Sequence, residues 1–184
     1  MSSYINIKFR NALESLPHLV LDSLQVTREL RQTSCEGPEV FAKLDVKSFY
    51  MSGLPDVLSN TSCKVFDVGE RGLLEETVFW SLDHQYVCVL ELPNRVWKVE
   101  LGSGMGLKHS GEVADASFYT LHEMHLLPRL DEFSIKRYCR FKDDILVIGS
   151  DMQGVVEFCK FLVHSASSSA FHVHPLQNVK KPQE

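Results

Sequence analysis

The sequence has no long apolar run. None of its 184 residues belongs to a stretch approaching the roughly 20 consecutive apolar residues that a membrane-spanning helix needs. The first residues, Met1 to Asn6, carry no basic region leading into an apolar segment, so we expect no secretory signal. These features predict an intracellular protein, in the nucleus or the cytoplasm, without a membrane partner.

Cysteines in metal-binding pairs are also absent. The chain has five cysteines, which are scattered and odd in number. None of them shows the short paired spacing of a zinc site, and reduced thiols are the expected state of such cysteines inside a cell. The sequence therefore predicts neither a zinc-binding module nor a disulfide-stabilised secreted domain.

Basic charge is scarce. The 19 Lys and Arg residues are outnumbered by 24 Asp and Glu residues, which gives a net charge of −5 and a pI near 5.9. Affinity for nucleic acid comes mostly from basic side chains that replace counterions along the phosphates. The chain alone is therefore not expected to hold nucleic acid tightly, although its length and its 44% hydrophobic content suit one globular domain.

Two adjacent acids interrupt an otherwise apolar pattern near the C-terminal end. Asp143 and Asp144 lie between strand-like segments at 138–141 and 145–148, so we expect them at the tip of a hairpin. Neighbouring carboxylates repel one another unless a cation lies between them, and hard oxygen ligands of this kind suit Mg2+. The alternative is an ordinary solvated turn.

A third acid lies in similar surroundings. Asp45 comes near the end of a short apolar strand predicted over 40–46, where a lone aspartate would otherwise be a helix cap or a turn former. Between the two acidic sites lies a glycine-rich segment, 102–111, followed by a helix predicted over 112–126. The order is therefore strand with acid, glycine-rich loop with helix, and hairpin with paired acids.

These three segments together resemble the motifs of reverse transcriptases. Asp45 with an aromatic pair ending at Tyr50 resembles motif A, Gly106 with Ser110 before a helix resembles motif B, and Phe-Lys-Asp-Asp at 141–144 is similar to motif C. Each motif is weak alone, and the three in this order are specific. The resemblance covers about 40–179 and leans toward Penelope-like or other non-viral retroelements.

The resemblance implies an α+β fold: a polymerase palm, with an antiparallel sheet and helices packed on one face. It divides the chain into a helical segment at 1–39 (the end of the fingers or a scaffold), the palm at 40–179 and a tail at 180–184. No basic fingers segment and no thumb is recognised. We therefore expect a fragment or retroelement remnant, with other parts of a retroelement polyprotein as partners.

The implied activity is RNA-directed DNA synthesis with Mg2+, or with Mn2+ in its place. By resemblance, Asp45 and Asp143 would bridge two metal ions, the Val46 carbonyl would add a ligand, and Asp144 would be the weaker acid. The partners would be an RNA or DNA template with its primer and deoxynucleoside triphosphates. Lys180 or Lys181 as a late general acid is the weaker alternative to a solvated tail.

The resemblance also assigns contacts with the nucleotide. They fall to six residues: Tyr50, Met105, Gly106, Ser110, Phe141 and Lys142. Tyr50 matches the ring that excludes a ribose 2′-hydroxyl, and its alternative is a core tyrosine. Ser110 would be the motif serine, a helix cap, or both. Met105 stands where many relatives have glutamine, and His109 replaces a small residue, so polar contacts there are in doubt.

Two other functions stay open at this point. An inactive, nucleic-acid-binding remnant fits the acidic charge and the departures at Met105 and His109. A two-metal nuclease or cyclase on a similar palm fits less well, because the glycine-rich motif would have no role in it.

Periodicity makes further structural predictions. It predicts helical segments over 5–30 with a break at Pro17, a helix over 70–85, and a helix from an Asp151 cap to 163. It also predicts a hairpin of strands 86–92 and 96–101 with one buried face that includes Trp97, and a last strand over 171–179.

Overall fold

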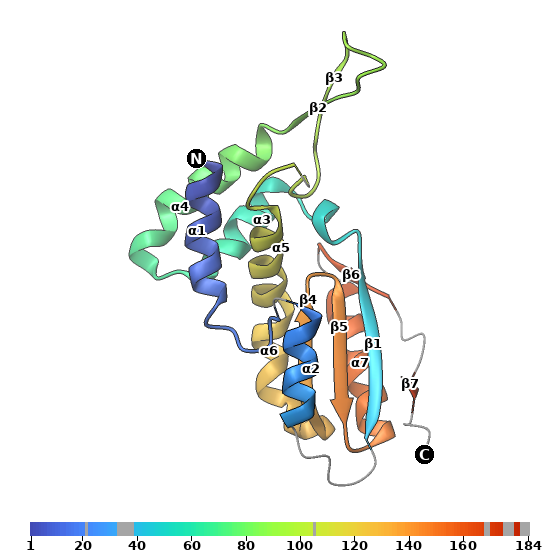
Figure 1. Ribbon diagram of the computed structural model, residues 1–184. Helices are drawn as coiled ribbons and strands as arrows, with labels where there is room; N and C mark the ends of the chain where they lie inside the picture. The colour runs from blue at the N-terminus through green and yellow to red at the C-terminus, as the bar shows by residue number, and fades with distance from the viewer. Residues whose placement is uncertain (21, 33–38, 105, 168–169, 175–178, 181–184) are drawn as a thin grey trace. The chain divides into compact units, whose positions relative to one another are not determined.

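The protein is described by a computed structural model that covers residues 1–20, 22–32, 39–104, 106–167, 170–174 and 179–180. It forms two compact units (Figure 1). The first, here called the helical unit, comprises Met1–Ser15 and Ser48–Leu121. The second, the sheet unit, comprises Leu16–Lys47 and His122–Glu184. The predicted division at 39/40 and 179/180 stays a prediction.

The helical unit is built from four α-helices: α1 (Ser2–Leu13), α3 (Pro55–Ser62), α4 (Val68–Asp83) and α5 (Ser110–Phe118). The 3-10 turn η1 (Phe49–Met51) precedes α3, and the 3-10 turn η2 (Cys63–Val65) joins α3 to α4. Helix α5 continues into the π-turn η3 (Tyr119–Glu123). The aromatic rings of Phe9 and Phe66 meet edge to face with centroids 4.9 Å apart. The buried Leu74, Val78 and Leu82 confirm the four-residue period predicted for α4.

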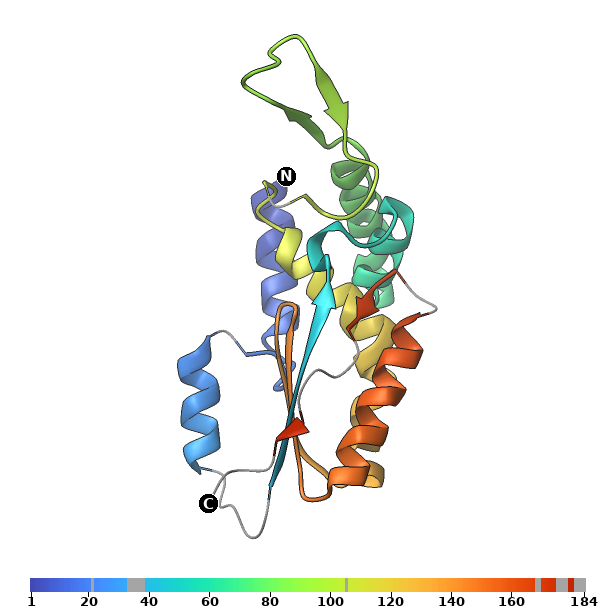
Figure 2. The ribbon, with the colours of Figure 1, turned by 90° about the vertical axis from the view of Figure 1, so that its right-hand side faces the viewer.

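The hairpin after α4 is exposed on both faces. Its strands, β2 (Tyr86–Cys88) and β3 (Val96–Lys98), pair antiparallel but are shorter than predicted. The predicted buried face is wrong, because the Trp97 side chain is 41% exposed and Leu101 is 50% exposed. Figures 1 and 2 both draw the hairpin as a projection beyond the end of α4. Alternation of apolar residues specifies a strand, but it does not supply an element to cover the apolar face.

The sheet unit contains a five-stranded sheet. Its strands lie in the order β4-β5-β1-β6, and β7 also pairs with β1. The strands are β1 (Val40–Lys47), β4 (Ile135–Phe141), β5 (Asp144–Gly149), β6 (His172–Val173) and β7 (Val179–Lys180). All of these pairings are antiparallel. The sheet and helices confirm the predicted α+β fold. The last predicted strand, 171–179, contains β6 and begins β7, and its residues 175–178 lie outside the described residues.

Helix α7 (Met152–Ser167) covers one face of this sheet. Its inner residues Val155, Phe158, Cys159 and Leu162 are all at most 1% exposed, as the helical period predicted. Asp151 caps the helix, because its Oδ2 accepts a 2.7 Å hydrogen bond from the Gly154 amide. The helix runs beyond its predicted end at 163, to Ser167.

The remaining elements of the sheet unit are α2 (Ser23–Gln32), α6 (Met124–Leu126) and the 3-10 segment η4 (Leu127–Phe133). Figures 1 and 2 show α2 on the side of the sheet opposite α7. None of the α2 side chains that the structure describes is buried, so the packed face is the one under α7. Pro17 lies between α1 and α2, which confirms the predicted break. No helix in the described part of the chain is long and apolar enough to cross a membrane.

Candidate active site

The backbone of the sheet unit brings the three predicted acids to one place. In the register of β1 with β5, Asp45 lies directly opposite Asp144. The Val46 amide donates a 2.9 Å hydrogen bond to the Asp143 carbonyl, so the remaining acid lies at the next step of the same ladder. Residues directly opposite in an antiparallel pair have Cβ atoms about 4.5–5.5 Å apart. Acids far apart in sequence therefore converge at the end of β1.

A two-residue turn carries the acid pair. Phe141 is the ladder partner of Asp144, which leaves Lys142 and Asp143 as the turn between β4 and β5. The backbone of Lys142 has φ of 54°, a left-handed conformation that costs a residue with a Cβ atom about 1–2 kcal/mol. The prediction of acids at a hairpin tip is confirmed, with Asp143 in the turn and Asp144 as the first strand residue.

The charges at the site are arranged around a lysine. Lys43 and Asp45 both project to the exposed side of β1, and the Lys43 Nζ lies 2.8 Å from Asp144 Oδ1. The hydrogen bond and charge of Asp144 raise the pKa of Lys43, and the charges of Asp45 and Asp143 add to this effect. The Lys43 and Asp144 side chains are 67% and 52% exposed, so solvent screens the ion pair strongly.

The donor set suits a magnesium or manganese ion, because the two carboxylates of the β4–β5 hairpin and that of Asp45 on β1 supply hard oxygen ligands. The side chains as they lie do not form such a centre. Within the residues that the structure describes, no group of three or more His, Cys, Asp or Glu side chains is arranged to hold a metal ion. The Asp144 carboxylate is directed to Lys43 instead. A metal ion that used the Asp144 carboxylate would therefore require the Lys43–Asp144 pair to open.

A buried ion cluster lies directly behind the turn. Arg140, Glu123, Tyr138 and His18 form it, and Arg140 and Glu123 are 0% exposed. Arg140 donates hydrogen bonds to both oxygens of the Glu123 carboxylate, from Nε to Oε1 at 2.7 Å and from Nη2 to Oε2 at 2.8 Å. The Tyr138 hydroxyl donates to Oε1 at 2.7 Å, and His18 Nε2 lies 3.1 Å from Oε2. The cluster was not predicted from the sequence.

Electrostatics within this cluster favour an ionised carboxylate. Burial alone would raise the pKa of Glu123, but the charge and hydrogen bonds of Arg140, with His18, outweigh it and hold the pKa at about 2. Burial and the Glu123 charge raise the pKa of Tyr138 well above its ordinary value, so its hydroxyl stays a donor. The only sequence signal was a charged residue, Arg140, between the apolar Cys139 and Phe141 of the predicted strand.

Tyr50 belongs to the helical unit, where it lies in η1. Its side chain is partly exposed, and its ring meets Phe49 edge to face at 5.5 Å. The Tyr50 carbonyl accepts a 2.8 Å hydrogen bond from the Ser103 amide. Gly102 has φ of 79°, and a Cβ atom there would overlap the Tyr50 carbonyl and the Met51 backbone. Partial exposure distinguishes Tyr50 from the buried Phe49 and does not fit a core tyrosine.

The glycine-rich loop precedes α5 in the same unit. The Ser110 hydroxyl is buried and donates to the carbonyls of Gly104 at 2.5 Å and Leu107 at 2.9 Å. Ser110 therefore closes its own loop and is not a side-chain cap of α5. A Cβ atom on Gly106 would meet nothing within 4 Å, so no crowding within the chain explains that glycine. Met105 lies outside the described residues, as does Lys181, and for Lys180 only the backbone in β7 is described.

His109 departs from the motif and has a structural role. Its ring is fully buried, with Nδ1 2.9 Å from the Ser2 hydroxyl and Nε2 3.3 Å from the Ser81 hydroxyl. The ring thus connects α1 and α4 to the start of α5. Burial lowers its pKa, so the imidazole is neutral at pH 7.

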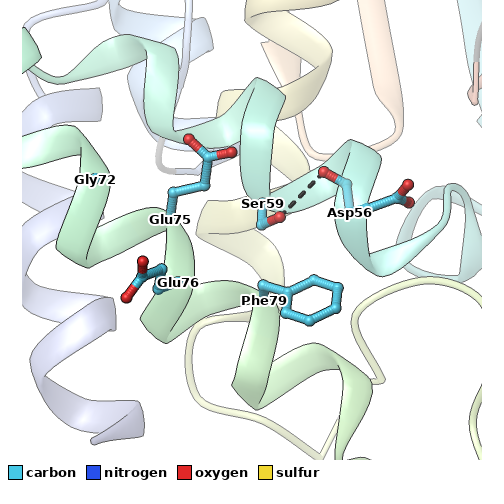
Figure 3. Close-up of a pocket in the computed structure, with 6 residues that line it drawn as sticks. All are labelled: Asp56, Ser59, Gly72, Glu75, Glu76 and Phe79. Carbon is cyan, nitrogen blue, oxygen red and sulfur yellow. Dashed lines mark hydrogen bonds between the residues drawn. The ribbon is translucent and has the colours of Figure 1, made fainter.

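An open pocket of about 380 Å3 lies between α3 and α4 of the helical unit (Figure 3). It is lined by Asp56, Ser59, Gly72, Glu75, Glu76 and Phe79. The Ser59 hydroxyl is already engaged with the Asp56 carbonyl at 3.0 Å. Because its charged side chains are all carboxylates, the pocket would repel phosphate. It contains none of the residues predicted to bind a nucleotide.

Comparison with known proteins leaves the sequence without a match: no protein-family model and no curated protein matches it. Solved structures do match, and they include telomerases from two Candida species. Apo telomerase from Candida tropicalis aligns with all of this chain at a TM-score of 0.75 and 12% identity, over 37% of its own length. A C-terminally truncated form of that enzyme aligns over 99% of this chain at a TM-score of 0.70 and 14% identity, and over 41% of its own length.

Telomerase from Candida albicans, in complex with the TWJ fragment of telomeric RNA, also aligns over 99% of this chain. Its TM-score is 0.66 at 13% identity, and the aligned part is 34% of the telomerase chain. The chain therefore spans about a third to two fifths of the length of the structures it matches. At these identities the likeness shows the fold, which is of the type found in telomerase, a polymerase related to reverse transcriptases.

Proposed function

We propose that the chain is the catalytic palm part of an RNA-directed DNA polymerase, which extends a primer on a template by nucleotidyl transfer. One observation carries the proposal: the β1–β5 register sets Asp45 opposite Asp144, with Asp143 beside Val46 in the adjoining turn. The telomerase-like fold agrees with it at the level of the polymerase class.

In this proposal Asp45 and Asp143 hold two divalent ions, Mg2+ or Mn2+, with the Val46 carbonyl as a further ligand. When bound, such ions lower the pKa of the attacking 3′-hydroxyl and neutralise charge on the leaving pyrophosphate. Asp144 would have to leave Lys43 to bind an ion, which would make it the weaker ligand. The protein's own contribution is positioning, since phosphoryl transfer needs little covalent chemistry from side chains.

The proposed contacts with the nucleotide differ in their support. Tyr50 is partly exposed, as a ring that excludes a 2′-hydroxyl would have to be. Gly106 offers open space for a close approach of the substrate to the backbone. Ser110 serves the nucleotide indirectly, through the loop that its hydroxyl closes. Phe141 and Lys142 flank the acids, and Met105 is proposed from its motif position alone.

The proposed partners are a primer, deoxynucleoside triphosphates and a template. Two of the similar telomerases were solved with a fragment of telomeric RNA, which favours an RNA template for this chain. With a net charge of −5, the chain needs basic surfaces from elsewhere for a firm grip on nucleic acid. An origin in a retroelement polyprotein, Penelope-like or of another non-viral type, is supported by motif spacing only.

A second candidate is an inactive remnant that keeps the fold. The Lys43–Asp144 ion pair favours it, because a lysine there occupies an acid that an active centre would use. The two candidates differ in what the acids do, and a substitution of one acid separates them.

The test is primer extension on an RNA template by the full chain, with Mg2+ or Mn2+, at protein concentrations high enough to compensate for weak substrate binding. Wild type is expected to add nucleotides slowly, and Asp143→Asn to add none. Asp131→Asn removes an equal charge from an exposed position in η4 and serves as the matched control. No incorporation by wild type at any concentration would favour the remnant. Incorporation that survives Asp143→Asn would show that the activity does not depend on the proposed acids, and would overturn the proposed site.

A further inference from the structure

We infer that Arg140 is a positioning residue, which holds the turn carrying Asp143 in place by bonding it to the buried Glu123. This inference rests on the proposed function for its catalytic consequence. Its structural part concerns three groups of the sheet unit: the Arg140 guanidinium, the Glu123 carboxylate and the Lys142 carbonyl.

The guanidinium donates hydrogen bonds both to the buried Glu123 and to the turn. Nε and Nη2 are used on the two oxygens of Glu123, at 2.7 and 2.8 Å. Nη1 donates to the carbonyl of Lys142 at 3.1 Å, which is the residue immediately before Asp143. The rigid, planar fork of arginine allows this division, because its donors keep fixed directions. A lysine carries its three donors on a single nitrogen, without the separated nitrogens of the fork, so it would not reproduce the three contacts in this geometry.

Glu123 is a fixed point for this contact. Its Oε1 accepts from both Arg140 and Tyr138, and its Oε2 accepts from Arg140 and contacts His18. All three partners and the carboxylate lie within one buried cluster. A carboxylate with both oxygens occupied and no solvent access has little freedom to move, so the guanidinium bonded to it is fixed as well.

The backbone of Arg140 is also hydrogen-bonded on the edge of β4 that does not pair with β5. Its amide donates to the His18 carbonyl at 2.9 Å, and its carbonyl accepts from the Val20 amide at 3.0 Å. The segment before α2 therefore pairs with β4 beside the turn. With backbone and guanidinium both fixed, the bond to Lys142 is a constraint on the turn and does not simply follow its movement.

The turn needs such a constraint. Lys142 has φ of 54°, a conformation that a lysine adopts at a cost. A buried ion pair is costly to desolvate, and an apolar pair of similar volume often stabilises a core as well. The fold retains the ion pair where one of its donors reaches the residue before the proposed catalytic acid. We conclude that its value is geometric.

Two variants of the full chain test this. Arg140→Lys keeps the charge but loses the planar fork whose separate nitrogens bond Glu123 and the turn at the same time. Tyr138→Phe removes one hydrogen bond from the same carboxylate without touching the turn, and is the matched control. The Val46 amide reports the turn directly, because it donates to the Asp143 carbonyl. Its hydrogen exchange needs neither metal nor activity.

We expect Arg140→Lys to speed exchange of the Val46 amide by on the order of tenfold or more, and Tyr138→Phe to change it about twofold at most. In primer extension, Arg140→Lys should lower kcat by about tenfold or more with KM for the nucleotide little changed, because the acids are misplaced while nucleotide contacts remain. If Arg140→Lys does not fold, Glu123→Gln, which weakens the attachment of the guanidinium at constant shape, makes the same prediction for Val46.

Equal exchange of the Val46 amide in wild type and Arg140→Lys, or equal speeding in Arg140→Lys and Tyr138→Phe, would overturn the inference. These results are separate from the fate of the proposed function. A wild type that adds no nucleotides refutes the polymerase, while Val46 exchange still decides whether Arg140 holds the turn. An active wild type with unchanged exchange in Arg140→Lys keeps the polymerase and refutes the positioning.

Discussion

Removing Lys43 should strengthen metal binding at the acids. Its ammonium lies 2.8 Å from Asp144, and the pKa of Lys43 is raised chiefly by the hydrogen bond and charge of that acid. A metal ion that uses Asp144 must first displace the lysine. Lys43→Met keeps most of the aliphatic stem and removes the competitor, so the cost of displacement disappears from the binding free energy.

The size of the effect follows from the exposure of the pair. Because both side chains are more than half exposed, the ion pair is worth at most about 1 kcal/mol after screening. At about 1.4 kcal/mol per tenfold, the gain in affinity for Mn2+ should be about two- to fivefold. The gain should shrink as salt is added, since salt weakens the competing ion pair.

Titration of Mn2+ followed by electron paramagnetic resonance measures this affinity directly. Lys160→Met removes the same charge from the exposed face of α7 and should leave affinity unchanged within about 1.5-fold. Unchanged or weaker binding in Lys43→Met would refute the competition. An equal gain in Mn2+ affinity in both variants would mean that the change in net charge strengthens binding, and not the removal of a competing lysine.

Three further outcomes are expected. Burial lowers the pKa of His122 from 6.5 to about 4, so the unfolded chain binds a proton more readily than the folded protein does. The free energy of unfolding should therefore fall by about 3 kcal/mol as the pH drops from about 6.5 to 4. Urea unfolding measures this fall, which should be smaller in His122→Gln. Lys142→Gly should relieve the left-handed backbone and raise stability by about 1 kcal/mol, or about 2–4 °C in Tm, and a lower Tm would contradict the conformation. Tyr50→Ala should raise the ratio of ribo- to deoxyribonucleotide incorporation by about tenfold in a polymerase completed with fingers and thumb; an unchanged ratio in a folded variant removes Tyr50 from that role.

Much of the sheet unit was predictable because its signals are local. The apolar strand before Asp45 and the apolar pattern around Asp143 and Asp144 each specify a strand, and two polar residues between strands specify a tight turn. Strand pairing was less accessible, since it depends on which residues meet across the sheet. The motif order supplied what periodicity could not, namely that Asp45 and the hairpin belong together.

The parts that sequence reasoning missed depend on long-range contacts. Arg140 bonds to Glu123 on another element, and no local sequence pattern predicts such a buried ion pair. Trp97 was wrongly predicted to be buried. Its alternating pattern does form a strand, but its side chain is left exposed. His109 looked like a defect in a motif, and the structure gives it two hydroxyl neighbours from distant helices.

The central claim is that Asp45, Asp143 and Asp144 form one divalent metal centre. Anomalous diffraction from crystals soaked in Mn2+, with a primer–template and an unreactive nucleotide analogue bound, tests it most directly. The account predicts two manganese peaks about 3.5–4 Å apart, held by Asp45 and Asp143, with Asp144 released from Lys43. Manganese bound elsewhere, or absent from the end of β1 while the analogue is seen, would contradict the claim.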